Sequence, residues 1–437
     1  MYYFIGIKGT GMAALACILH DCGNEVIGSD LERHFFTQEP LEKRGITMLP
    51  FNPANIKDNM TVIIGNAFLE DFPEVIAARN NKTCTCYRYH EFLGLLMKDY
   101  SSIGIAGSHG KTTTTNMLAT VLNEKHETGY LIGDGTGHLS PECRDFVVEA
   151  DEFRNHFLAY HPDYAIITNI DWDHIDFFPT LESYVEAYKA FCRQVSKAVV
   201  VYGEDPYAHD LKPDCEILYY GLNKDDDIFA DNIDERADGM TFDVYFRGQY
   251  FGHFDLPFIG HHLLLNGLGV IGISILKGLT YEQIHDGLLK FKGAKRRFVV
   301  EEKGENVFID DYAHHPTEIK VTLQAARALY PDRKIVGIFK PHRVSRVYYF
   351  IDKFVEAFTY ADEVGVCEFT SIDDHDMKDR DIDISYLAER VPGSHIFHET
   401  DQDARVLADM APAVYVFMSS KDIYPFKDKL EKIMNEK

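Results

Sequence analysis

The sequence predicts an α/β protein of three domains, and two features of the chain lead to this prediction. The first is length, because 437 residues are too many for one core when domains usually hold roughly 100–200 residues. The second is pattern. Short β-branched runs alternate with helical patterns, as in parallel, doubly wound sheets, and the alternation starts afresh twice along the chain. Boundaries ahead of the two restarts give domains at 1–97, 98–294 and 295–437.

The first domain is predicted to have a Rossmann-like fold that binds a nucleotide. Strands are expected at residues 2–7, 25–30, 61–66 and 83–89. A glycine-rich segment between the first strand and a helix at Met12–Cys22 contains Gly6, Gly9, Thr10, Gly11 and Met12. Such a segment lets backbone N–H groups approach a diphosphate, and Asp30, at the end of the next strand, could bind a ribose. The pattern alone favours NAD, but a second nucleotide motif further along the chain indicates a UDP-sugar bound as substrate.

The second domain opens with the strongest motif of the chain, Gly-Ser-His-Gly-Lys-Thr-Thr-Thr at residues 107–114. It follows the predicted strand SSIGIA and precedes an amphipathic helix, which is the context of a Walker A loop. Its backbone N–H groups could close on phosphate oxygens, while Lys111 reaches the β- and γ-phosphates and Thr112 ligates Mg²⁺. A turn that contained Gly-Lys-Thr only by chance would not be flanked by a strand and a helix. The motif predicts a P-loop-type ATPase domain, with an antiparallel insert near residues 240–254.

Two polar clusters follow later strands of the same domain. Residues 149–152 read EADE after the run FVV, and residues 171–176 read DWDHID after AIITNI. Ligands collect at the carboxyl ends of strands in open α/β sheets, so both clusters are expected beside the nucleotide loop. Because Mg²⁺ prefers hard oxygen ligands, Glu149 is a natural ligand and His174 a less usual one. Either cluster alone could consist of charged loop residues that face solvent. The two clusters together with Lys111 indicate a metal site.

The third domain, again predicted as Rossmann-like, holds two motifs rich in His, Arg and Tyr. They are DDYAHHPTE at residues 310–318 and KPHRVSR at residues 340–346. Such side chains can bind a carboxylate and shield phosphoryl oxygens. Taken singly, His314, His315 or His342 could be a structural histidine, and Arg343 or Arg346 a surface ion pair. Their coincidence after predicted strands favours a functional cleft.

Composition and charge exclude several other classes of protein. The chain is 46% hydrophobic and 26% charged, which is typical of a folded protein. A net charge of −25 argues against a nucleic-acid partner. The N-terminus lacks a secretory pattern and no run of about 18 apolar residues occurs, so we expect a cytosolic protein without a membrane partner. Eight Cys, of which only Cys84 and Cys86 are close in sequence, form neither a zinc nor a disulfide pattern, so reduced, mostly buried thiols are expected.

Together the motifs resemble those of the Mur ligases over nearly the whole chain. GIKGTGM, GSHGKTTT, EADE, TNID-x-DH, GAKRRF, DDYAHHPTE and PHR-x-x-R occur in the order and spacing of that family, above all of the branch that joins L-alanine to UDP-N-acetylmuramate. Seven motifs in this order are highly specific as a set. The resemblance implies an ATP- and Mg²⁺-dependent ligase of peptidoglycan synthesis, a monomer or weak homodimer. Its first domain would hold the UDP-sugar, and its third would bind the amino acid and close over the other two.

The resemblance also implies roles for individual residues, carried over by matching position. Those for the UDP-sugar are Gly6, Gly9, Thr10, Gly11, Met12, Asp30, Asn66 and Arg88. Those for ATP are Gly107, Ser108, His109, Gly110, Lys111, Thr112, Thr113, Asn266, Arg297 and Asp311. The metal ligands would be Thr112, Glu149 and His174. Lys111, His314, Arg343 and Arg346 would be catalytic, with Tyr312, His342 and Ser419 at the acceptor site.

Three segments depart from the family pattern. Leu263 stands where the family usually has the first Asn of a G-H-N-x-x-N motif. Residues 370–376 (TSIDDHD) and 419–422 (SSKD) replace glycine-containing segments where the amino acid should bind. Side chains there add volume and polarity where glycine gives backbone access, so the acceptor could instead be Gly, Ser or a peptide. In other family members a carbamylated lysine holds a second Mg²⁺; Lys189 lies near that position, although Tyr188 aligns better.

The expected reaction passes through an acyl phosphate. The muramyl carboxylate attacks the γ-phosphate of ATP, and the amino acid's amine then displaces phosphate from the acyl carbon. A histidine or a carboxylate would take the proton, and the sequence does not distinguish the two. One alternative is a paralogue that binds nucleotide or UDP-sugar without ligation, although a complete Mg²⁺–ATP constellation argues against it. A dinucleotide-dependent oxidoreductase is a more distant alternative.

Overall fold

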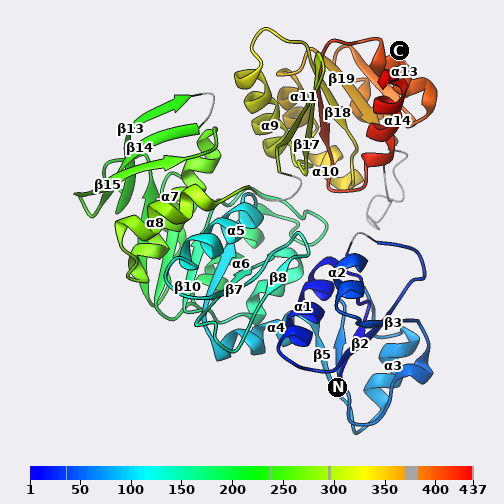
Figure 1. Ribbon diagram of the computed structural model, residues 1–437, viewed down its shortest axis with the longest axis vertical. Coiled ribbons are helices and arrows are strands. Elements are labelled where there is room, and N and C mark those ends of the chain that lie inside the picture. Colours follow the sequence, from blue (N-terminus) through cyan, green and yellow to red (C-terminus); the bar gives the residue numbers. More distant parts are fainter. Residues whose placement is uncertain (36, 237–238, 294–296, 370–381, 436–437) are drawn as a thin grey trace. The chain divides into compact units, whose positions relative to one another are not determined.

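We obtained a computed structural model that describes residues 1–35, 37–236, 239–293, 297–369 and 382–435. The described residues form three separate β-sheets, each with helices packed on it (Figure 1). The predicted α/β class with three sheet-based domains is confirmed. By compactness the chain falls into two units, Met1–Trp172 with Leu181–Ala294, and Asp173–Thr180 with Lys295–Lys437. The domain limits proposed from the sequence remain predictions.

The first sheet is parallel throughout, in the order β3-β2-β1-β4-β5, which matches five strands of the Rossmann arrangement. Its strands are β1 (Tyr2–Ile5), β2 (Val26–Asp30), β3 (Thr47–Pro50), β4 (Thr61–Ile64) and β5 (Thr85–Arg88). Its helices are α1 (Thr10–Asp21), α2 (Gln38–Lys43), α3 (Pro73–Asn80) and α4 (Tyr89–Leu96), with short turns η1 (Pro53–Asn55) and η2 (Met97–Asp99). The central strands bury Tyr3, Ile5, Val62 and Ile64, so they read as apolar runs in the sequence.

The second sheet, within the described residues, has ten strands in the order β15-β14-β13-β12-β11-β10-β6-β9-β7-β8. These are β6 (Ser101–Ala106), β7 (Thr128–Leu131), β8 (Gly137–His138), β9 (Asp145–Glu149), β10 (Tyr164–Ile167), β11 (Ala198–Tyr202), β12 (Glu216–Gly221), β13 (Ile228–Arg236), β14 (Gly239–Phe246) and β15 (Gln249–Leu256). The helices are α5 (Lys111–Leu122), α6 (Leu181–Cys192), α7 (His261–Leu276) and α8 (Tyr281–Lys290), with turns η3 (Phe153–Ala159) and η4 (Ala208–Asp210). Strands β13 to β15 pair antiparallel, which confirms the predicted insert.

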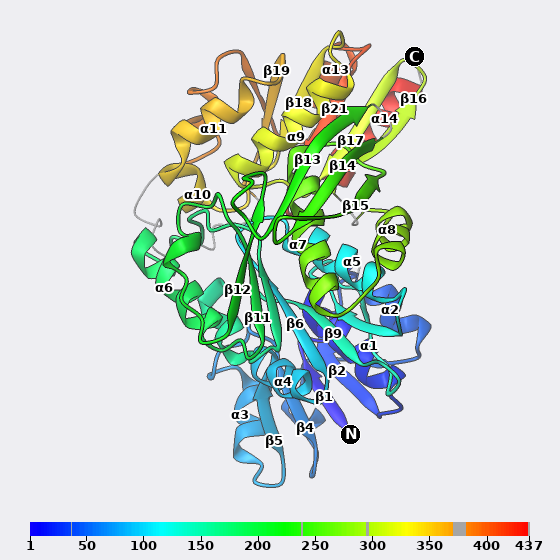
Figure 2. The same cartoon turned by 90° about the vertical axis from the view of Figure 1, so that its left-hand side faces the viewer.

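Helices cover both faces of this sheet and set the position of its strand ends. Figure 2 shows α5 and α7 together on one face and α6 on the other. On β6, Ile103 and Ile105 join the core with α5 and α7, whereas a Cβ at Gly104 would lie 3.1 Å from Phe191 of α6. Strand β6 runs parallel to both β9 and β10. The carboxyl ends of these three strands therefore lie at one edge of the sheet.

The second unit is built on the third sheet, in the order β16-β17-β21-β18-β19-β20, with β16 antiparallel to its neighbour. Its strands are β16 (Val299–Lys303), β17 (Asn306–Asp311), β18 (Ile335–Phe339), β19 (Glu363–Cys367), β20 (Ser394–Phe397) and β21 (Val414–Met418). Its helices are α9 (Pro316–Leu329), α10 (Val344–Tyr349), α11 (Ile351–Phe358), α12 (Ser385–Ala388), α13 (Asp401–Ala408) and α14 (Tyr424–Asn435). Residues 173–180, distant in sequence, belong to this unit.

Strands β3, β7, β8, β12, β16 and β20 were not expected from the sequence. Four of them, β3, β8, β16 and β20, lie at the edge of a sheet, whereas β7 and β12 lie inside the second sheet. An edge strand is covered incompletely, so it lacks the apolar run that reveals a central strand. The eight cysteines are free thiols, as expected, but only four of them are buried, fewer than predicted. Among the helices that the structure describes, none has both the length and the hydropathy needed to cross a membrane.

Candidate active site

The loop from Gly107 to Gly110 joins β6 to α5 in a conformation that only glycine adopts readily at both ends. Gly107 has φ +133° and Gly110 has φ +83°. A Cβ at Gly107 would lie 2.0 Å from Thr168 Oγ1, and one at Gly110 would lie 2.8 Å from Asn266 Oδ1. Helix α5 begins at Lys111 and has no side-chain cap, so its N-terminal N–H groups face the loop. The arrangement suits an anion of phosphate size.

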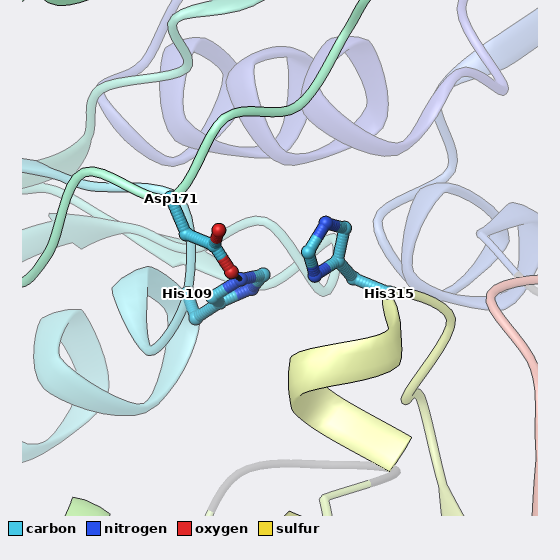
Figure 3. Close-up of side chains that lie close together, drawn as sticks. All are labelled: His109, Asp171 and His315. Atoms are coloured by element: carbon cyan, nitrogen blue, oxygen red, sulfur yellow. Dashed lines mark hydrogen bonds and ion pairs between the residues drawn. The ribbon is translucent and has the colours of Figure 1, made fainter. Parts of the chain in front are cut away.

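Residues that follow β10 hold this loop in place. Thr168 Oγ1 donates to His109 O at 2.6 Å, and His109 N donates to Asn169 Oδ1 at 2.9 Å. Asp171 N donates to Ser108 Oγ at 2.9 Å, and His109 Nε2 lies 3.1 Å from Asp171 Oδ2 (Figure 3). Because β6 and β10 are parallel neighbours, their carboxyl ends bring these residues together. His109 is thus oriented by a carboxylate.

Lys111 is held inside the loop by an ion pair and two carbonyls. Its Nζ donates to Glu152 Oε2 at 2.8 Å, to Gly107 O at 2.5 Å and to Ser108 O at 3.3 Å. Burial would lower the pKa of Lys111, but Glu152, Asp151 and Glu149 more than offset that effect and raise it. The ammonium therefore stays charged at neutral pH, so it can neutralise a phosphate but cannot act as a base.

Thr112 and Glu149 come together beside the loop. Thr112 Oγ1 lies 3.0 Å from Glu149 Oε2 and 3.2 Å from Glu149 Oε1. Gly133 N, just after β7, donates to the same carboxylate at 2.7 Å. A Cβ at Gly133 would lie 2.5 Å from Glu149 Oε2, so this glycine permits the approach. Hard oxygen donors from α5 and β9 thus converge at the carboxyl edge of the sheet.

Glu152 and Tyr184 are functional candidates that the sequence analysis did not single out. Glu152 is 1% exposed, and its Oε1 accepts from the Tyr184 hydroxyl at 3.1 Å. The same hydroxyl lies 2.8 Å from Ser108 Oγ and 3.3 Å from the Tyr188 hydroxyl. Tyr188 is fully buried and Lys189 instead pairs with Glu186 at 2.9 Å. Helical spacing of tyrosines four residues apart was the available signal for this network.

In the first sheet, the glycine-rich segment forms a tight turn before α1. Gly6 has φ +83°, and a Cβ there would collide with Phe68. Both oxygens of Asp30 are occupied by backbone N–H groups, those of Lys8 and Leu31, each at 2.7 Å. The N-terminus of α1, preceded by Gly9, has neither a side-chain cap nor an acidic residue in its first turn. A negative group would be stabilised there by the helix dipole.

Tyr89 contacts the start of α1 and was not predicted as a site residue. A Cβ at Gly11 would lie 2.5 Å from the Tyr89 hydroxyl, so this ring covers the turn. Burial, with Glu149 and Asp151 adding to it, raises the pKa of Tyr89. The hydroxyl therefore remains protonated and can donate a hydrogen bond. No motif marks it in the sequence, because its partner lies 78 residues earlier.

Asn66 and Arg88, both predicted to contact the UDP-sugar, have different kinds of partner in the structure. Asn66 Oδ1 is 3.0 Å from His90 Nδ1, and Asn66 Nδ2 is 3.2 Å from His156 Nδ1, with the two imidazoles stacked at 4.5 Å. Arg88 instead binds the Phe68 carbonyl and the Glu70 carboxylate. Asn66 is positioned between the first and second sheets, whereas Arg88 is paired with Glu70. Their roles toward a UDP-sugar stay predictions.

Asn266 is buried on α7 and lies against Gly110, near the predicted nucleotide loop. Leu263, the departure from the family pattern, packs partly against the core of the second sheet. Gly260 N donates to Glu235 at 2.8 Å before the helix begins. The substitution at Leu263 leaves Asn266 in contact with the loop.

In the second unit, Asp311 and Arg297 lie at the end of β17 and just before β16. Asp311 accepts from Phe298 N and from Ala313 N, both at 2.7 Å. Burial raises the pKa of Asp311 to about 6. The Arg297 guanidinium lies 4.8 Å from the Tyr312 ring and 3.6 Å from Glu318 Oε1. A buried acid and a stacked arginine are thus adjacent.

His314 lies on the loop before α9, and its contacts define its tautomer. Its Nδ1 is 3.0 Å from Tyr312 O and 3.0 Å from Glu318 Oε2, which can only accept. Nδ1 therefore carries the hydrogen, and Nε2 has the lone pair. Burial lowers the pKa of His314. The imidazole is neutral at pH 7 and can accept a proton at Nε2.

The two predicted arginines are paired with carboxylates from residues 173–180. Arg346 contacts both oxygens of Asp173 at 2.9 and 3.0 Å, and Arg343 contacts Asp176 at 2.7 Å. Burial alone would raise the pKa of Asp173, but Arg346 and nearby imidazoles hold it well below its usual value. His174, between these aspartates, has φ +52°. Its predicted role as a metal ligand stays a prediction.

His342 and Ser419 complete the predicted acceptor residues. Burial, together with Lys421 and neighbouring cations, lowers the pKa of His342 to about 2, so it is neutral. Ser419 is fully buried, and its hydroxyl donates to Lys340 O at 2.9 Å. The Ser419 hydroxyl thus forms a hydrogen bond with the protein backbone at Lys340. The other altered segment, residues 370–376, lies outside the described residues.

Comparison with known proteins places this arrangement in a family. Residues 1–101 match the model described as Mur ligase family, catalytic domain, and residues 105–274 match the Mur ligase middle domain. Residues 295–421 match the domain described as Mur ligase, glutamate ligase domain. The chain belongs to the Mur ligase family. It is an ATP-dependent ligase, and the resemblance inferred from its motifs is confirmed.

Relatives of this Mur ligase cover it from end to end. A UDP-N-acetylmuramate–L-alanine ligase of Lacticaseibacillus paracasei is 45% identical over 436 residues, covering 100% of this chain and 99% of the relative. The crystal structure of UDP-N-acetylmuramate–alanine ligase from Thermotoga maritima is 27% identical with a TM-score of 0.81, covering 100% and 99% of the two chains. A murein peptide ligase from Psychrobacter arcticus, with 22% identity, a TM-score of 0.76 and the same coverage, shares the fold.

Proposed function

We propose that this Mur ligase joins L-alanine to the carboxyl group of UDP-N-acetylmuramate in peptidoglycan synthesis, using ATP and Mg²⁺. The observation that carries the proposal is 45% identity over the full length to enzymes named for this reaction. The phosphate loop, in which Lys111 contacts Glu152 and Thr112 contacts Glu149, supports a catalytic protein over a non-ligating paralogue. Because ATP and UDP-sugars are intracellular metabolites, the reaction would take place in the cytosol. A monomer or weak homodimer remains a prediction.

The residues beside the loop fit a magnesium ion by their chemistry. The Thr112 hydroxyl and the Glu149 carboxylate are hard oxygen donors already within 3.2 Å of each other. His174 would be the third ligand by family position. When bound, Mg²⁺ would supply positive charge against the phosphate oxygens.

ATP phosphates would replace Glu152 as the partner of Lys111. Both are anionic oxygen groups, and the side chain already lies within the loop, so a short movement of Nζ suffices. The N–H groups at the start of α5 would bind the phosphate oxygens together with the ammonium. This concentration of positive charge supports attack at the γ-phosphorus.

In the first step a muramyl carboxylate oxygen forms a bond to the γ-phosphorus, the bond from that phosphorus to the bridging oxygen breaks, and ADP leaves. The product is an acyl phosphate. In the second step the neutral amine of L-alanine attacks the acyl carbon, and inorganic phosphate leaves with the electron pair of the C–O bond. We assign the amine proton to His314 Nε2, since that imidazole is neutral and its Nδ1 hydrogen is engaged.

The sequence of residues 419–422 left open which amino acid or peptide is the acceptor. The position of Ser419 argues against an altered acceptor site. Its hydroxyl is directed to Lys340 O and its side chain is fully buried, so it adds no bulk to a surface that an amino acid would contact. The guanidinium groups of Arg343 and Arg346 are suited to the carboxylate of the amino acid or to phosphoryl oxygens, provided that such a ligand displaces Asp176 or Asp173 from them. L-Alanine is favoured as the acceptor by the 45% identity to relatives named for it.

Release of inorganic phosphate tests the proposal. The assay contains ATP, Mg²⁺ and UDP-N-acetylmuramate, and compares L-alanine with glycine, L-serine and a muropeptide-type peptide. We expect phosphate release to depend on UDP-N-acetylmuramate and to be at least tenfold faster with L-alanine than with any other acceptor. A preference for glycine, serine or the peptide would change the substrate, whereas phosphate release independent of any acceptor would argue against ligation.

A further inference from the structure

Away from the loop and its substrates, three side chains of different chemistry converge at the base of the β7–β8 hairpin. They are Glu127, directly before β7, His138, the last residue of β8, and Cys143, in the turn before β9. One donor atom from each, a carboxylate oxygen, an imidazole nitrogen and a thiol sulfur, lies within 4.8 Å of the other two. We infer that these residues form a binding site for a thiophilic divalent cation such as Zn²⁺, separate from the predicted magnesium position.

The donor set decides the class of ion. Zn²⁺ binds thiolate, imidazole and carboxylate, usually with four ligands, whereas Mg²⁺ prefers oxygen ligands alone. Three protein ligands leave a fourth position for water. In a tetrahedral site ligand atoms lie about 3.5 Å apart. His138 Nε2 is 2.9 Å from Glu127 Oε1, so these two atoms need to separate only slightly.

The surroundings hold the sulfur and the carboxylate in position. Ser140 N donates to Cys143 Sγ at 3.4 Å, which fixes the position of the sulfur atom. Ser140 Oγ donates to Glu127 Oε1 at 2.8 Å, which orients the carboxylate. Contacts of this kind around the ligands are typical of metal sites.

Access to the site is compatible with binding from solution. Cys143 is 6% exposed, but the side chains of Glu127 and His138 are 43% and 41% exposed. A cation can therefore reach the sulfur past two partly exposed ligands. Sequence spacing did not reveal the site, because only one cysteine contributes and the three residues match no common zinc motif.

The site lies at the base of a hairpin whose tip contacts the predicted substrate machinery. Gly133 N donates to Glu149, and a Cβ at Gly135 would lie 3.2 Å from Thr10 Cγ2. Further along, a Cβ at Gly137 would lie 2.9 Å from Ile18 of α1. A cation that cross-links the base would stabilise this hairpin between α1 and Glu149.

Titration of the full-length, reduced protein with Co²⁺ tests the inference, because a thiolate ligand produces a sulfur-to-metal charge-transfer band. Excess Mg²⁺ is included to occupy oxygen-only sites. We expect one Co²⁺ per chain with such a band, its displacement by Zn²⁺, and an increase in Tm on binding. Affinity should fall as pH is lowered, because the thiol and imidazole must lose protons.

Variants assign the band to the three residues. Cys143→Ser should abolish it, and His138→Gln should weaken Co²⁺ binding about a hundredfold or more. The matched controls are Cys84→Ser, a thiol in another loop, and His253→Gln, whose imidazole contacts Asp243 at 2.8 Å without a thiol nearby in sequence. Both controls should bind Co²⁺ as the parent does.

Two results would overturn the inference. One is the absence of a charge-transfer band in the parent protein, and the other is a band that persists in Cys143→Ser. Should the buried Cys143→Ser variant fail to fold, His138→Gln decides the question, because its side chain is partly exposed and its replacement leaves the core intact. An unchanged Co²⁺ affinity in that variant would contradict the site.

Discussion

The phosphate loop at residues 107–112 and the arginine pair Arg343 and Arg346 both contain cations paired with carboxylates, but they are built in different ways. Lys111 is held by two carbonyls of its own loop and by Glu152, 41 residues away. Arg346 is held by Asp173, which lies 173 residues earlier in the chain. The loop is a continuous sequence motif, whereas the arginine cluster exists only because residues 173–180 belong to the C-terminal unit.

The positive charge is therefore neutralised differently in the two regions. In the loop, the counter-charge should be exchanged when a phosphate binds, so its removal should affect catalysis first. In the arginine cluster, a bidentate pair is enclosed by protein, so its removal should affect stability first. The comparison therefore predicts that substitutions in the two regions will have different principal consequences.

The largest expected effect comes from Lys111→Ala. Loss of the only ammonium in the loop should lower kcat at least about a thousandfold, equivalent to about 4 kcal/mol of transition-state stabilisation. The measurement is ADP formation with all substrates present. Lys125→Ala, which replaces an exposed lysine beyond the end of α5, should retain normal turnover.

Lys111→Ala also leaves Glu152 buried without its cation, so a loss of folding must be separated from a loss of catalysis. The double variant Lys111→Ala/Glu152→Gln removes that uncompensated charge, and circular dichroism verifies its fold. Rapid turnover by a folded variant would show that Lys111 does not serve the phosphates.

The next largest effect is a loss of stability when an ion pair of Arg343 or Arg346 is broken. Asp173→Asn should lower the free energy of unfolding by about 3 kcal/mol, because the pair it breaks is only 5% and 10% exposed. Asp176→Asn is the matched control, with side chains 17% and 20% exposed, and should cost about 1 kcal/mol. Urea denaturation followed by circular dichroism measures both. Equal losses would mean that burial does not distinguish the two pairs.

A smaller effect, on the KM for ATP, is expected from a substitution in the phosphate loop. Gly110→Ala introduces a Cβ 2.8 Å from Asn266 Oδ1 at φ +83°, and should raise KM for ATP about tenfold. Gly23→Ala is the control for backbone strain, since Gly23 has the same φ and no atom within 4 Å of the added Cβ. That variant should leave KM unchanged. If Gly110→Ala also bound ATP normally, the loop would have to adopt another conformation with nucleotide.

The smallest predicted effect is the pH dependence due to Asp311. Its pKa is about 6 in the folded protein and about 4 in an unfolded chain, so the folded state binds more protons between these values. Stability from this group is therefore greatest below pH 4 and is lost as pH rises through 6. Relative to Asp311→Asn, the parent should lose about 1 kcal/mol between about pH 5.3 and pH 7. A difference between the two proteins that does not change with pH would contradict the raised pKa.

Continuous motifs were the part of the candidate site most accessible to sequence reasoning. Residues 107–114 predicted a loop between a strand and a helix, and the structure has that loop between β6 and α5. Thr112 and Glu149 were expected together because parallel strands bring their carboxyl ends to one edge, and they are in contact. Tyr184 was missed, because a tyrosine in an amphipathic helix has the same pattern whether it fills a core or faces a ligand. Tyr89 was missed, because its partner Gly11 lies 78 residues earlier in the chain.

The amino-acid sequence by itself determined the α/β class, the central strands and the phosphate loop, because each depends on residues close together in the chain. Hydrophobic periodicity specifies buried strands, and glycine at fixed positions specifies backbone that other residues avoid. Only the tertiary structure decided the edge strands β3, β8, β16 and β20, the partners of Arg343 and Arg346, and the convergence of Glu127, His138 and Cys143. These features depend on contacts between separate segments, and burial and charge at such contacts are set by packing rather than by any local pattern.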